Sequence, residues 1–216
     1  MDRIFGLDSP FMRFLSLVAD LMLLNLLTIL CCLPVITAGA SFTALYYCCL
    51  KIRRNEEGYI TRMFFKSFRQ NLVQSIPLWL IFLVVAAGYA YDFRAANEGI
   101  IPRWVFYAGT AAFVLFSIVY IWVFPLLSRF DNPCGVTVKN AAVVSVTRLP
   151  STIVMLAVTV GFAFLCTPVV LGPDIFVRTL PVIFFFSFSL TAYLCAKIYD
   201  PVFRNIEELS ETKGDQ

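Results

Sequence analysis

The sequence predicts an all-α protein: a polytopic α-helical membrane bundle with six transmembrane segments, or five on an alternative reading of its first apolar run. Hydrophobic residues make up 60% of the chain and charged residues 14%, whereas a soluble domain has about 45–50% and about 25%. The mean hydropathy is +0.81. The bilayer is therefore the expected solvent, and helices are the expected spans, because the alternating pattern of a membrane barrel is absent.

The first apolar run, residues 14–50, carries a single charge, Asp20. As one helix it would be about 55 Å long at ~1.5 Å per residue, which overshoots a hydrocarbon core of about 30 Å. We expect a break between Pro34 and Gly39, because proline lacks an N–H and clashes with the preceding turn. Thr37 is the expected N-cap of the next helix.

Three readings of this run are open. A cleavable signal peptide, with an A-x-A match at 38–40, is disfavoured by the length of the run and by its polar residues. One span followed by an interfacial piece gives five spans and an outer N-terminus. A hairpin with spans at about 14–33 and 38–54 gives six spans and an inner N-terminus, and we favour it. Its second helix would pack closely through small residues: Ala38, Gly39, Ala40, Ser41 and Ala44.

The rest of the chain contains four uncharged runs, each long enough to cross once. We expect a single membrane domain over 1–216, with these spans at about 72–91, 104–127, 150–171 and 179–197. The connectors, at about 55–71 and 129–148, are basic, whereas the turns at 92–103 and 174–178 are short and balanced in charge. Basic loops stay in the cytoplasm. We therefore expect a multi-pass protein of the cell membrane with a cytoplasmic C-terminus.

The candidate polar-path residues Asp20, Asn25 and Thr28 lie inside the first predicted span. An ionised carboxylate within a span is costly and usually faces the bundle interior. Two interpretations follow. The three residues line a polar path, or Asp20 is structural, paired with an arginine near the inner face or placed at the interface.

The connector at 55–71 has the pattern of a basic amphipathic helix. Ile60, Phe64 and Phe68 share one face, and the candidate docking residues Arg62, Lys66 and Arg69 lie on the others. Such a helix lies on an anionic inner leaflet or docks a cytoplasmic partner. Nucleic acid is not an expected partner, because the basic residues lie beside spans. Residues 138–150 weakly match the loop by which transporter permeases dock their ATPases.

The chain offers no catalytic constellation. It has no histidine, which removes the commonest general base and metal ligand, and it contains no nucleotide-binding or hydrolase motif. Its seven cysteines include two adjacent pairs, which do not fit zinc-ligand spacing. We expect packing roles for them, with no disulfide, metal or cofactor.

Three stretches, "NLLTILCCLPVITAGASFTALYY", "KSFRQNLVQSIPLWLI" and "FPLLSRFDNPCGVTVKNA", resemble the YesL-like family of bacterial integral membrane proteins. The resemblance runs over most of the chain in the same order. It implies a membrane protein, and it implies an association with sugar uptake, because genes of that family often lie near carbohydrate-uptake and polysaccharide-degradation genes. It supplies no catalytic or binding residues.

The sequence therefore predicts a non-enzymatic accessory or structural component associated with solute uptake, carbohydrate among the candidates, with membrane transporter subunits as partners. The alternative is a small transporter or channel subunit that uses a polar path near Asp20. A self-sufficient carrier usually needs several polar or charged groups within its spans, and few are present here, which favours the accessory role.

Overall fold

The computed structural model describes residues 10–56, 58–165 and 173–214, and within these ranges the regular structure is helical, with no strand. The elements are α2 (Pro10–Cys32), the short 3₁₀ helix η1 (Val35–Thr37), α3 (Ala38–Arg53), α4 (Ile60–Asn97), α5 (Arg103–Arg129), α6 (Cys134–Thr147), α7 (Leu149–Leu165) and α9 (Pro173–Gly214). The predicted fold class is confirmed.

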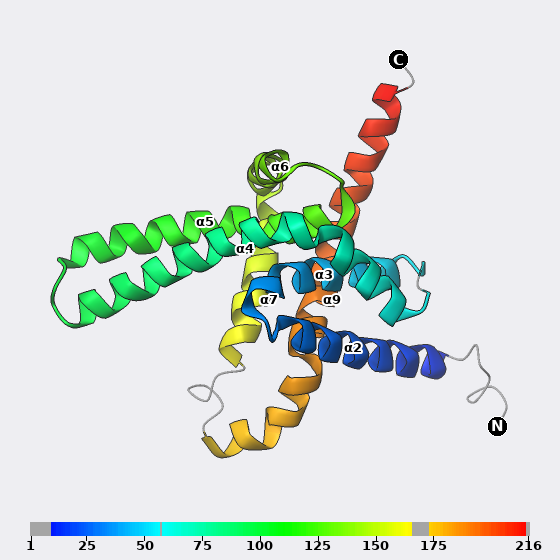
Figure 1. Cartoon of the computed structure of the whole chain (residues 1–216), viewed down its shortest axis with the longest axis horizontal. Coiled ribbons are helices and arrows are strands. Elements are labelled where there is room, and N and C mark those ends of the chain that lie inside the picture. Colours follow the sequence, from blue (N-terminus) through cyan, green and yellow to red (C-terminus); the bar gives the residue numbers. More distant parts are fainter. Residues whose placement is uncertain (1–9, 57, 166–172, 215–216) are drawn as a thin grey trace.

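Consecutive helices form pairs that pack side by side: α2 with α3, α4 with α5, and α7 with α9 (Figure 1). In this view α7 and α9 run across the other two pairs, and α9 touches α2, α3 and α7. Beyond the crossing, α4 and α5 extend together as a two-helix arm, in which the rings of Tyr89 and Phe113 stack with centroids 4.4 Å apart.

Five helical segments of the described residues are long and apolar enough to cross a membrane. A sixth is counted if α6 and the apolar part of α7, which meet at a bend of 102°, form one broken span. The first apolar run supplies two of the five, Phe11–Cys32 and Val35–Arg53, which agrees with the hairpin. Whether the protein has five or six spans thus depends on the predicted span at 150–171. Part of that span lies outside the described residues.

The break in the first run occurs where the sequence predicts it, between the end of α2 at Cys32 and the start of α3 at Ala38. Thr37 occupies the N-cap position of α3, as the sequence predicts, but its side chain does not cap the helix. Thr37 has helical dihedral angles and makes no side-chain cap bond to α3. Its hydroxyl instead donates to the carbonyls of Cys31 and Pro34, at 2.8 Å each. The carbonyl of Cys31 belongs to the last turn of α2, where carbonyls have no partner within the helix.

The expected connector at 55–71 and the span that follows it are largely one helix, α4. Pro77 lies inside it, and proline within a helix removes one hydrogen bond. One face nevertheless stays buried along the helix at helical spacing, namely Ile60, Phe64, Ser67, Asn71, Ser75 and Leu78. Continuous packing of this face keeps the helix in one piece.

The closest approach of α3 to α4 depends on Gly39. A Cβ atom at this position would lie 2.7 Å from Cβ of Trp79 and 2.9 Å from the carbonyl oxygen of Ser75. The small residues predicted to allow close packing of α3 are all buried. The indole of Trp79 also donates to the carbonyl of Val35, at 2.7 Å, so α4 holds the break in the first run in place.

Substitution Gly39→Ala should therefore destabilise the protein by about 1–3 kcal/mol, the usual cost of overpacking. The matched control is Gly88→Ala, also in a helical span, where a Cβ would meet nothing within 4 Å. We expect a lower thermal unfolding temperature in detergent for Gly39→Ala and no loss for Gly88→Ala. Equal unfolding temperatures for the two variants would contradict the close contact.

Candidate functional site

Asn25 joins α2 to α9 through its side-chain amide. The side chain is fully buried. Its Nδ2 donates to the carbonyl of Phe184 at 2.6 Å, and its Oδ1 accepts hydrogen bonds from the backbone N–H groups of Phe188 at 2.8 Å and Ser189 at 3.0 Å. One amide group therefore bonds to three backbone groups of a helix more than 150 residues away in sequence.

These contacts place Asn25 within the hydrogen-bond ladder of α9. In an uninterrupted α-helix the N–H of residue 188 bonds to the carbonyl of residue 184. Asn25 bridges these same two groups. α9 is helical through this turn, so Asn25 adds hydrogen bonds from α2 to groups that belong to the helix's own ladder.

The other two polar candidates on α2 differ from Asn25. Thr28 is buried and donates to the carbonyl of Leu24 within its own helix, at 2.7 Å. Asp20 is half-buried and lies about one and a half helical turns before Asn25. The polar path through Asp20, Asn25 and Thr28 stays a prediction, since Asn25 and Thr28 are bonded to backbone groups.

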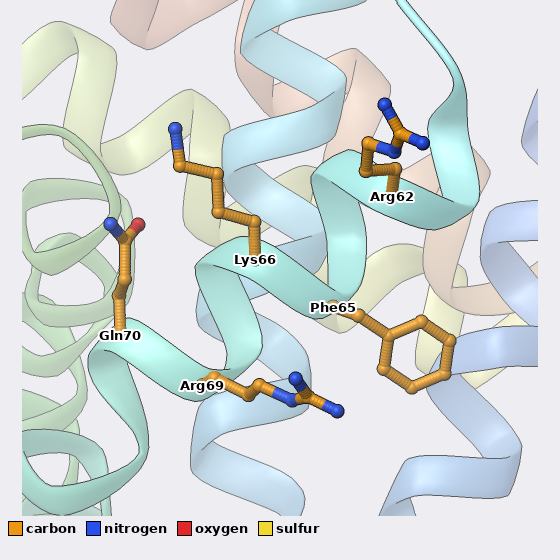
Figure 2. A pocket seen from close by; sticks show the side chains of 5 residues that line it. All are labelled: Arg62, Phe65, Lys66, Arg69 and Gln70. Carbon is orange, nitrogen blue, oxygen red and sulfur yellow. The ribbon is translucent and has the colours of Figure 1, made fainter.

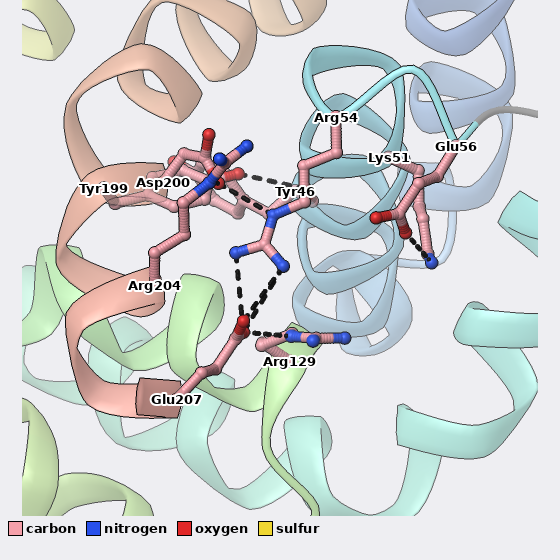
Figure 3. Close-up of polar contacts among 9 residues, drawn as sticks. All are labelled: Tyr46, Lys51, Arg54, Glu56, Arg129, Tyr199, Asp200, Arg204 and Glu207. Carbon is pink, nitrogen blue, oxygen red and sulfur yellow. Dashed lines mark hydrogen bonds and ion pairs between the residues drawn. The ribbon is translucent and has the colours of Figure 1, made fainter. Parts of the chain in front are cut away.

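A cluster of ion pairs also connects the helices. It contains charged residues of α9, of the end of α5 and of the position after α3 (Figure 3). We use the name ion-pair cluster for Arg54, Arg129, Asp200, Arg204 and Glu207. Nε of Arg54 lies 2.7 Å from Oδ1 of Asp200, and Nη1 of Arg54 lies 3.1 Å from Oε2 of Glu207. Glu207 also pairs with Arg129 at 2.7 Å, and Arg204 pairs with Asp200 at 3.4 Å.

Burial sets the strength of this cluster. The side chains of Arg54 and Asp200 are only 9% and 6% exposed, so water screens their attraction little. Burial alone would lower the pKa of Arg54, but hydrogen bonds and the charges of Glu207 and Asp200 outweigh it and raise the pKa above its ordinary value. Arg54 therefore stays charged throughout the physiological range.

The ion-pair cluster is not evident from the sequence. Asp200 and Glu207 lie seven residues apart, which is about two helical turns, so they share a face of α9. That spacing, together with arginines at the ends of the apolar runs, is the only feature of the sequence that points to the cluster. The pairing itself depends on how α3, α5 and α9 meet in space.

The predicted docking residues Arg62, Lys66 and Arg69 share one exposed face of α4 with Phe65 and Gln70. We call these five residues the basic face. They line an open cavity of about 480 Å³ (Figure 2). The expected apolar face points the other way: Ile60 and Phe64 are buried in the protein core, and Phe68 packs half-buried against it.

The cysteines take up packing positions. The six that the structure describes are free thiols, and Cys48, Cys49 and Cys195 are buried. The predicted packing role is consistent with these positions. Cys166 lies outside the described residues.

Comparison with known families gives one match: a family model described as "Protein of unknown function, DUF624" matches residues 21–93. The match covers about a third of the chain and includes Asn25, Arg54 and the basic face, whereas the α9 partners of Asn25 and Arg54 lie outside it. Comparisons with curated proteins and with solved structures found no match. The chain is thus similar to this family over the second half of α2, all of α3 and most of α4.

Substitution Asn25→Ala should destabilise α9 locally at the turn from Phe184 to Ser189. It removes three hydrogen bonds that join α2 to this turn of α9, each of which contributes about 0.5–1.5 kcal/mol to stability. We expect faster hydrogen exchange at the amides of Phe188 and Ser189, measured by mass spectrometry of the peptide that contains them. The control is Asn97→Ala at the exposed end of α4, which should leave that peptide unchanged. Equal exchange in wild type and Asn25→Ala would show that Asn25 does not hold α9.

Proposed function

We propose that the chain is a non-enzymatic accessory or structural component of a membrane solute-uptake system, with carbohydrate as the candidate class of solute. One observation carries the proposal: the amide of Asn25, fully buried beside α9, bonds to three backbone groups of that helix. A carrier needs polar groups that its solute can reach. Here a fully buried polar group of α2 joins that helix to α9.

The proposed location is the cell membrane, with the C-terminus and the ion-pair cluster on the cytoplasmic side. The basic connectors support this orientation, because lysine and arginine accumulate in cytoplasmic loops. The resemblance to the YesL-like family supports a bacterial membrane protein and, through gene neighbourhood, the link to sugar uptake.

The proposed contact with a partner subunit is on α6. Its inner face is buried through Thr137, Ala141, Val144 and Ser145. Its outer side exposes three valines: Val136 at 41%, Val143 at 55% and Val146 at 67%. This apolar strip lies within the stretch that weakly matches a permease docking loop, on the side proposed to face the cytoplasm. A transporter subunit is therefore the partner that we propose.

Purification in mild detergent from cells that make the protein tests this proposal. We expect membrane transport subunits to co-purify with the wild type and to be reduced about fivefold or more by Val146→Lys, as for an interface residue that contributes about 1 kcal/mol or more. The control is Tyr59→Lys, at a site that is 82% exposed on another surface. Recovery of no transport subunit, or equal recovery with Val146→Lys, would contradict the accessory role.

The alternative, a small transporter or channel subunit, is favoured by the position of the bridged turn of α9. Helices broken beside polar groups form substrate sites in several transporters. Pro181 lies inside α9, three residues before the carbonyl of Phe184 to which Asn25 donates, and proline removes one helical hydrogen bond. Asp20 on α2 is the candidate charge of such a path.

For this alternative, Asp20→Asn should lower solute flux in reconstituted vesicles by tenfold or more, an order of magnitude that corresponds to about 1.4 kcal/mol, without lowering protein yield. The control, Asp131→Asn, removes an exposed carboxylate after α5 and should leave flux unchanged. Flux that is equal in wild type and Asp20→Asn would end the polar-path hypothesis.

A further inference from the structure

The basic face of α4 is an open cationic groove. Its residues follow the spacing i, i+3, i+4, i+7 and i+8, from Arg62 to Gln70, so their side chains project from a single side of one helix. Figure 2 shows them fanning outward from the ribbon, with no second element among the labelled lining residues. A groove of this shape accepts a ligand from the side and does not enclose it.

The three cations of the groove have no carboxylate partner in the part of the chain that the structure describes. Four other cations near the proposed cytoplasmic end do have one: Lys51, Arg54, Arg129 and Arg204 each form an ion pair. Arg62, Lys66 and Arg69 form none with the described residues. Their positive charge is therefore available to an external anion.

The groove is held in position by the opposite side of the helix. Phe64 is fully buried and Ser67 is 2% exposed. Asn71 is also buried, and its amide donates to the carbonyl of Ser67 at 2.9 Å. Because the apolar face of this segment is packed into the protein, it cannot insert into lipid as an amphipathic surface helix would. Any attraction to a membrane must come from the basic face.

The location of the groove favours a lipid headgroup as the anion. Arg69 is the last charged residue before the uncharged run that begins at Gln70. Arg62 and Arg69 are about 10 Å apart along the helix at ~1.5 Å per residue, comparable with a headgroup layer of about 5–8 Å. Phe65 is 42% exposed beside the cations, and aromatic side chains are enriched at this depth. An acidic peptide or free phosphate would gain nothing from that ring at the bilayer edge.

From this geometry we infer that the basic face is a binding site for the phosphate headgroup of an anionic phospholipid. Arg62, Lys66 and Arg69 donate hydrogen bonds to phosphate oxygens, as charged donors do, and Phe65 packs against the glycerol and upper acyl chain. The site goes beyond the proposed accessory role and needs no partner subunit. It also reverses the expected mode of contact, in which the apolar face would have met the leaflet.

Native mass spectrometry of the purified full chain tests this inference. The probes are phosphatidylglycerol and phosphatidylcholine with the same acyl chains. We expect the wild type to retain phosphatidylglycerol in preference. In the triple variant Arg62→Gln, Lys66→Gln, Arg69→Gln, affinity for phosphatidylglycerol should fall about fivefold per charge, on the order of 100-fold in total. The control Arg53→Gln, Lys139→Gln, Arg148→Gln removes the same charge from other exposed positions and should keep the preference.

A second measurement on the wild type does not depend on the folding of a variant. A phosphatidylglycerol analogue with a photoreactive headgroup should crosslink within residues 62–70. Crosslinks elsewhere, equal retention of the two lipids, or unchanged affinity in the triple variant would overturn the inference. Displacement of the lipid by inorganic phosphate or by polyglutamate at equal charge would also overturn it, because the ligand would then be a soluble anion. The lipid-binding experiments use the purified chain without a partner subunit. Their outcome therefore does not depend on the outcome of the co-purification experiment.

Discussion

The bilayer core offers no water to a polar group, and this constraint shapes the whole molecule. A backbone or side-chain group inside the core must find its partner within the protein. Among the described residues, every buried side-chain nitrogen or oxygen has a hydrogen-bond partner. Many of these partners are carbonyls of the same helix, as for Thr28 and Thr43. Other partners lie on a different helix, as for Asn25, whose partners belong to α9, and for Trp122 of α5, whose indole donates to Thr152 of α7.

α9 is the helix on which the packing of the others depends. Asn25 attaches α2 to its apolar part, and Arg54 and Arg129 attach α3 and α5 to its charged end. Removing one partner of a buried ion pair typically costs about 3–5 kcal/mol, because the other charge is left without compensation. The hydroxyl of Tyr199, a residue of α9, donates to the carbonyl of Tyr46 on α3 at 3.0 Å. The buried polar groups therefore connect the helices to one another. The basic face of α4 is exposed at the surface and takes no part in these connections.

Local sequence was enough to predict the helical class, the break near Pro34, the close packing at Gly39 and the exposure of Arg62, Lys66 and Arg69. Composition and short-range spacing determine these features. Other features could not be predicted from local sequence, because they depend on contacts between distant segments. The bonds of Asn25 join positions 159 or more residues apart, and the ion pair of Arg54 with Asp200 joins positions 146 apart. The continuity of α4 depends on its buried face, and no local signal reveals that. The polar path at Asp20 and the docking partners stay predictions.

The membrane arrangement underlies both proposals, and thiol labelling in intact cells tests it most directly. Single cysteines would replace Tyr59, Asp131 and Asn97, all of which are exposed, and an impermeant thiol reagent would be compared with the background of the unsubstituted protein. If the α4–α5 pair crosses the bilayer with its basic ends inside, Asn97→Cys should react in intact cells. Tyr59→Cys and Asp131→Cys should react only after permeabilisation. Reaction of Tyr59→Cys in intact cells, or of all three sites alike, would contradict the orientation, and with it the lipid site and the cytoplasmic docking surface.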